Sequence, residues 1–187
     1  MVRTRVGYAG GTLKDPTYRK LGDHTESLQI DFDPEVITYE ELLEIFWDSH
    51  DPTLPTWSRQ YMSIVFYHTE EQRRLAIESK EREESWLGRS IVTEIIPFSD
   101  FYLAEDYHQK YYLRQEPGLF QELSAIYPDI SDFIDSTAVA RLNGYVSGYG
   151  TPETFEEELS SLGLSEAGRN RLLDIANRGL VPGCVVP

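Results

Sequence analysis

Short strand-like runs alternate with longer helix-like runs along the first hundred residues, and this alternation constrains the fold more than any other feature of the chain. Leu28, Ile30 and Phe32 fall on one face of an extended segment, as in a half-buried strand. Thr38-Tyr-Glu-Glu41 matches a capping box and begins an amphipathic helix. Strands are predicted at residues 3–8, 27–33, 63–67 and 91–96, and a long charged helix at residues 69–86. This order predicts an α/β class.

Charge and cysteine content exclude several classes of function. The chain has 187 residues, a formal net charge of -15 and a single cysteine, Cys184. So acidic a chain repels nucleic-acid phosphates and anionic membranes, and neither is an expected partner. One cysteine excludes an internal disulfide framework, and the histidines show no metal-binding spacing. With no signal-peptide core after Met1, we expect a cytoplasmic protein that needs no metal or other cofactor.

The pattern changes in the last third of the chain. Past Pro117, short helical runs are separated by glycines. We therefore divide the chain into a domain of residues 1–135 and a helical C-terminal extension of residues 136–187. The apolar stripe of this extension is too small to be buried without other contacts.

Three stretches carry residues that point to a chemistry. They are Val6-Gly-Tyr-Ala-Gly-Gly11 with Pro16-Thr-Tyr18 and Gly22-Asp-His-Thr-Glu26, then Gln60-Tyr61-Met-Ser63 with Glu70-Glu71-Gln72, and then Phe101-Tyr-Leu-Ala-Glu-Asp-Tyr-His-Gln-Lys-Tyr111. In order and spacing they resemble the type A peptide methionine sulfoxide reductases over about residues 3–113. The resemblance implies an α+β two-layer sandwich, in which helices flank a mixed sheet, of the ferredoxin-like reductase fold.

The resemblance also implies a reaction, the reduction of methionine-S-sulfoxide in oxidised proteins or peptides, which belongs to oxidative-stress defence and protein repair. A cysteine thiolate attacks the sulfoxide sulfur while a partly desolvated carboxylic acid, by resemblance Glu26, protonates the oxygen. The hydroxyls of Tyr18, Tyr61 and Tyr111 would hydrogen-bond the oxygen and the acid. The resulting cysteine sulfenic acid condenses with a second thiol, and thioredoxin or another dithiol reduces the disulfide.

The sequence departs from the family pattern at the nucleophile. In the family, the nucleophile lies in a Gly-Cys-Phe-Trp-Gly motif ahead of the segment that matches Arg3, and residues 1–187 contain no such motif. We therefore expect the first strand and the nucleophile helix to be absent, as in a fragment whose true start lies upstream, and the chain alone to be inactive. Two smaller departures are the loop from Pro52 to Gln60, which lacks an acid that many members have, and Asp23, where many carry glycine.

Cys184 lies in a Gly-Cys pair near the C-terminus, and the resemblance makes it a candidate resolving thiol. Two alternatives stay open on the sequence. The chain could be a non-catalytic pseudoenzyme or binding module that recognises oxidised methionine or a protein partner. Alternatively, Cys184 could fold back and serve as the nucleophile itself.

Overall fold

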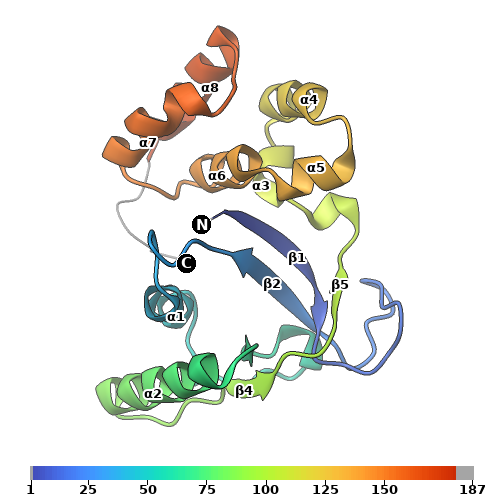
Figure 1. The fold of residues 1–187 in the computed structure, drawn as a ribbon, viewed down its shortest axis with the longest axis vertical. Helices are drawn as coiled ribbons and strands as arrows, with labels where there is room; N and C mark the ends of the chain where they lie inside the picture. Colours follow the sequence, from blue (N-terminus) through green and yellow to red (C-terminus); the bar gives the residue numbers. More distant parts are fainter. Residues whose placement is uncertain (1, 180–187) are drawn as a thin grey trace. The chain divides into compact units, whose positions relative to one another are not determined.

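A computed structural model describes residues 2–179, which divide into two compact units (Figure 1). The helical unit comprises residues 2–5, 30–32 and 105–179, and the mixed unit comprises residues 6–29 and 33–104. Strands β1 (Arg3–Ala9) and β2 (Thr25–Asp31) each run from one unit into the other. In residues 2–179 no helix has both the length and the apolar character that crossing a membrane requires.

The remaining elements follow in chain order. The mixed unit continues with α1 (Tyr39–Asp48), η1 (Arg59–Tyr61), β3 (Ile64–Tyr67), α2 (Glu70–Leu87), β4 (Glu94–Pro97) and β5 (Phe101–Leu103). The helical unit contains η2 (Asp106–His108), α3 (Tyr111–Arg114), α4 (Pro117–Ile126), α5 (Ile130–Asp135), α6 (Thr137–Val146), α7 (Pro152–Glu158), η3 (Leu159–Ser161) and α8 (Glu166–Ala176).

The strands form two small sheets. One has the order β2-β1-β5, and β1 pairs antiparallel with β5, with Tyr8 opposite Tyr102 (Figure 1). The other joins β3 and β4 in parallel through the crossover helix α2. The predicted mixed α/β class with flanking helices is confirmed, but two sheets replace the single mixed sheet that was expected. Pro97, the last residue of β4, has no backbone N–H with which to extend a ladder.

Helices α1 and α2 bury the core of the mixed unit. Its buried members are Leu43, Trp47, Val65, Ala76 and Ile91. The predicted capping box is confirmed, because the backbone N–H of Glu41 donates to the Thr38 hydroxyl at 3.2 Å and the Thr38 N–H donates to the Glu41 carboxylate at 2.7 Å. Helix α1 therefore begins where the sequence predicts.

The helical unit has a larger apolar core of its own. Its buried members are Leu113, Leu119, Leu123, Phe133, Val139, Leu142, Tyr145, Phe155, Leu162, Leu164 and Leu172. This core takes side chains from both sides of residue 136, so the helices of the predicted extension are buried together with α3, α4 and α5. The domain division at residue 135 stays a prediction, and it does not coincide with a change in packing.

Ion pairs fix the start of β1 within the helical unit. Arg3 binds Asp31, and it also reaches Asp135 at 3.1 Å; Arg5 binds Asp135 at 2.6 Å and Asp31 at 3.2 Å. Beside them the buried Lys110 donates to the backbone carbonyl of a β1 residue at 2.6 Å. Burial lowers the pKa of Lys110 to about 8, and the Asp135 carboxylate opposes this shift.

Candidate active site

The mixed unit brings Glu26, at the start of β2, against the short helix η1. The hydroxyl of Thr25 donates to the carbonyl of Arg59 at 2.8 Å, and the side-chain amide of Gln60 donates to Glu26 Oε1 at 2.6 Å. Thr25 is buried, whereas Glu26 points to solvent because side chains alternate along a strand. One strand start and one helical turn thus hold the carboxylate in place.

Two of the predicted tyrosines lie beside this carboxylate. A hydrogen bond with the neighbouring phenol of Tyr18 raises the pKa of Tyr61, and the Glu26 carboxylate adds a smaller contribution in the same direction. Tyr18 is 40% exposed and Tyr61 is 49% exposed. The three side chains therefore form an open acid–phenol cluster, which can donate hydrogen bonds or a proton to a bound oxygen. We call Glu26, Tyr18 and Tyr61 the acid–phenol cluster below.

Backbone turns position Tyr18 in this cluster. Thr17 and Lys20 exchange two backbone hydrogen bonds, of 3.2 and 2.9 Å, which close a turn around Tyr18. Upstream, Gly10 has a φ of 78°, a conformation that residues with a Cβ rarely adopt. At Gly11 an added Cβ would lie 2.6 Å from the backbone nitrogen of His24. The two glycines of the first motif therefore let β1 turn closely past the segment that leads into β2.

His24 and Asp23 hold the loop after β1 from the other side. The ring of His24 is fully buried; its Nδ1 accepts from the Gly11 N–H at 3.1 Å and its Nε2 lies 2.8 Å from the Leu13 carbonyl. Nδ1 accepting and Nε2 donating define a neutral imidazole. Asp23 accepts from the backbone N–H of Thr12 at 2.8 Å and from its hydroxyl at 2.9 Å. Asp23, which departs from the family pattern, therefore fixes the loop after β1 by these hydrogen bonds.

The other predicted site residues belong to other parts of the chain. Tyr111 is the first residue of α3 in the helical unit, is 57% exposed and packs edge to face on Tyr112. Cys184 lies outside the described residues. Glu26 is exposed, not partly desolvated as its expected role requires, because it accepts a hydrogen bond from the polar Gln60 side chain and the neighbouring phenols are themselves open to solvent. Within residues 2–179 no group of His, Cys, Asp and Glu side chains is arranged to hold a metal ion.

Comparison with known proteins connects this cluster to a reaction. The family model described as peptide methionine sulfoxide reductase matches residues 1–138. The chain belongs to this family. A second model, described as the helical domain of selenoprotein methionine sulfoxide reductase A, matches residues 132–171. The motifs that carry the sequence resemblance all lie within the first match.

Relatives extend the reductase assignment over most of the chain. A Drosophila melanogaster protein named peptide methionine sulfoxide reductase is 45% identical over 171 residues, which are 90% of this chain and 68% of the relative. A rice relative, named peptide methionine sulfoxide reductase A5, is 42% identical over 82% of this chain, which spans 62% of that protein. The chain thus spans about two thirds of the length of these curated relatives.

Solved structures of the family share the fold. The reduced form of Mxr1 from Saccharomyces cerevisiae matches with a TM-score of 0.56 and 33% identity, over 61% of this chain and 71% of that one. Methionine sulfoxide reductase A of Corynebacterium diphtheriae matches with a TM-score of 0.55 and 33% identity, over 62% of this chain and 64% of that one. The α+β reductase fold predicted from the motifs is confirmed.

Two contacts of this reductase-family site were missed in the sequence. Gln60 was part of a recognised motif, but its hydrogen bond to Glu26 joins residues 34 positions apart and leaves no local pattern. Asp23 accepts from the backbone N–H groups of Thr12 and Leu13, eleven and ten positions earlier, and such a contact also leaves no local pattern.

Asp23 makes the loop after β1 sensitive to acid. Hydrogen bonds from Thr12 lower the pKa of Asp23 to about 2. Because this folded-state pKa lies below the unfolded value of about 3.9, the carboxylate stabilises the fold above about pH 4, and this contribution is lost as the pH falls toward 2. We expect a carboxyl carbon NMR titration of Asp23 to have its midpoint near pH 2, and Asp23→Asn to be less stable in urea at pH 6 with the deficit shrinking toward pH 2. A midpoint near 4 would contradict this account.

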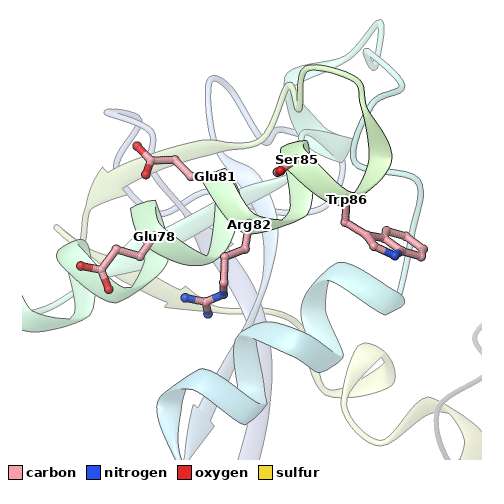
Figure 2. A pocket seen from close by; sticks show the side chains of 5 residues that line it. All are labelled: Glu78, Glu81, Arg82, Ser85 and Trp86. Carbon is pink, nitrogen blue, oxygen red and sulfur yellow. The ribbon is translucent and has the colours of Figure 1, made fainter.

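An open hollow on α2 is separate from the residues of the acid–phenol cluster. Its lining residues are Glu78, Glu81, Arg82, Ser85 and Trp86, which all come from this one helix (Figure 2). Their spacing of three and four residues places them along one helix face. Figure 2 shows the Trp86 ring projecting away from α2, and its side chain is 79% exposed. A hollow lined by one helix face lacks the convergent polar groups of a reaction site.

Proposed function

We propose that this protein is a peptide-methionine (S)-S-oxide reductase, which reduces methionine-S-sulfoxide in oxidised proteins or peptides. One observation carries the proposal: Glu26, Tyr18 and Tyr61 lie together in a chain whose residues 1–138 match the reductase family. An acid and two phenols beside one another supply the proton and the hydrogen bonds that a departing sulfoxide oxygen needs.

The reaction balances with thiols as the reductant. A cysteine thiolate attacks the sulfoxide sulfur to form an S–S bond, and the S–O bond breaks as the oxygen leaves as water with protons that Glu26 helps to deliver. Water then attacks the cysteine sulfur, the S–S bond breaks, methionine is released and the cysteine becomes a sulfenic acid. A second thiol then condenses with the sulfenic acid and expels water, and a dithiol such as thioredoxin reduces the disulfide. No metal or prosthetic group takes part in these steps.

The exposure of Glu26 fits a site in which the carboxyl group is covered only when substrate binds. Covering a carboxyl group with apolar atoms disfavours its charged form. Binding of the sulfoxide and its methyl group over Tyr18 and Tyr61 would therefore favour the protonated acid when it is needed. Tyr111 remains a further candidate donor to the oxygen.

The proposal extends to the setting of the reaction. Residues 1–135 form the reductase domain, and residues 136–187 are a helical extension that carries Cys184 as the resolving thiol. The protein repairs oxidised proteins in the cytoplasm under oxidative stress, with thioredoxin as its reductant. The family nucleophile belongs to a Gly-Cys-Phe-Trp-Gly segment, which residues 1–187 do not contain.

A comparison of two proteins tests the proposal. One is residues 1–187, and the other is the same chain preceded by a family segment that carries Gly-Cys-Phe-Trp-Gly. With dithiothreitol as reductant, we expect the extended protein to reduce a peptide with methionine-S-sulfoxide and to leave the R epimer unchanged, whereas residues 1–187 alone show no turnover.

Either of two results would count against it. A folded extended protein without turnover contradicts the assigned reaction. Turnover by residues 1–187 contradicts the need for an added nucleophile, and Cys184→Ser would then show whether that thiol performs the attack. Circular dichroism of both proteins establishes that each is folded.

A further inference from the structure

The loop between α1 and η1 exposes an aromatic side chain close in sequence to Gln60, the residue that donates to Glu26. Trp57 is 93% exposed, and within residues 2–179 its ring has no stacking partner and its indole N–H has no hydrogen-bond acceptor. Single exposed apolar residues are common and by themselves need no explanation. The position of Trp57 is what distinguishes it: Gln60, the partner of Glu26, lies three residues further along the chain.

Hydrogen bonds anchor both ends of the loop that carries Trp57. At its start, Asp51 accepts from the backbone N–H of Thr53 at 2.9 Å and from its hydroxyl at 2.6 Å, and the carbonyl of Pro52 accepts from the Val92 N–H at 2.9 Å. At its end, the Ser58 hydroxyl caps η1. Between these anchors, Pro55 fixes a further backbone angle. Less ordering entropy is therefore lost when a ligand binds.

We infer that Trp57 is a specificity-determining residue that contacts the peptide around methionine sulfoxide, and this inference rests on the proposed function. Three residues span at most about 11 Å, and a peptide advances about 3.3–3.6 Å per residue. With the sulfoxide at Glu26 and Tyr61, a peptide side chain two or three positions away can therefore reach the Trp57 ring. An exposed indole combines an apolar face with a free N–H donor, which suits a peptide side chain and its backbone carbonyl.

The consequence is a preference among substrates. Apolar residues two or three positions from the sulfoxide gain contact with Trp57, and glycines there do not. A single blocked amino acid, N-acetylmethionine sulfoxide amide, is too short to reach the ring. Trp57 therefore contributes to binding of protein-borne sulfoxide and leaves binding of the isolated sulfoxide unchanged.

Isothermal titration calorimetry on residues 1–187 measures this preference. The ligands are a heptapeptide with central methionine-S-sulfoxide and leucines two and three positions away, its glycine counterpart, its unoxidised form and N-acetylmethionine sulfoxide amide. We expect Trp57→Ala to raise the Kd for the leucine peptide about tenfold, to the level of the glycine peptide. The Kd of the blocked amino acid should stay the same.

Trp86→Ala is the matched control, because Trp86 is also largely exposed but lies on α2 (Figure 2). It should change none of these values. If the unmodified chain prefers the oxidised leucine peptide and Trp57→Ala binds it equally well, the inference is wrong and the proposed function stands. If the unmodified chain does not distinguish oxidised from unoxidised peptide, the proposed function fails and the inference fails with it.

Discussion

Replacing Glu26 with glutamine is expected to lower kcat of the nucleophile-bearing reductase by about 10²–10⁴-fold, the usual contribution of a positioned general acid. The amide oxygen of a glutamine can still accept the hydrogen bond that Gln60 donates at 2.6 Å. The geometry is therefore kept, and only the ability to deliver a proton is lost. Steady-state reduction of a methionine-S-sulfoxide peptide between pH 5 and 9 measures the effect.

The pH profile separates a proton donor from a structural residue. Loss of the acid should remove the part of the pH dependence of kcat that comes from its protonation. The KM of the variant should stay within about threefold of the parent value, because the phenols still bind the oxygen. Glu44→Gln, at an exposed position of α1, is the matched control and should change neither parameter. A Glu26→Gln enzyme with kcat within threefold of the parent would remove Glu26 from the chemistry.

Replacing Phe133 with alanine is expected to lower the free energy of unfolding by about 3–5 kcal/mol, the range observed for large aromatic residues in packed cores. Phe133 is 1% exposed, and its ring contacts Phe120 edge to face with centroids 5.5 Å apart. The guanidinium of Arg114 lies 5.9 Å from the centre of the Phe133 ring, so the loss leaves a cavity beside a charged group. Urea denaturation followed by circular dichroism gives the value.

A conservative substitution provides the comparison for this core. Phe133→Leu keeps most of the volume and should cost less than about 1.5 kcal/mol. If Phe133→Ala also costs less than that, the helical core is packed more loosely than the buried residues indicate. Neither change touches a residue of the acid–phenol cluster, so an enzyme that carries Phe133→Leu should keep its activity.

Local signals predicted the elements that depend on neighbouring residues. The capping box at Thr38 and Glu41 marks the start of α1 because its hydrogen bonds span three positions. Elements that depend on pairing between residues distant in sequence were harder to predict. The three-residue strand β5 exists because it pairs with β1 almost a hundred residues earlier, and an aromatic-rich sequence gave no alternation to reveal it.

The predicted strand at residues 91–96 shows the same limit on a smaller scale. It begins only at Glu94, because the N–H of Ile91 donates to Glu84 and that of Val92 donates to Pro52. In the site, motif spacing led to Glu26, Tyr18 and Tyr61, which the fold brings together. Motif spacing predicted neither the contacts of Asp23 nor the exposure of Glu26, since contacts and burial depend on segments distant in sequence.

Because β1 is divided between two units, a single cut in the chain does not separate one complete unit from the other. A single cut after residue 104 leaves the helices without residues 2–5 and 30–32, and so without the arginines and Asp31 that surround Asp135. Asp135 would then lose both of its arginine partners, which is costly at a partly buried site. The helices are thus not an interchangeable module. A chimaera that swaps them between relatives must carry the first strand with them.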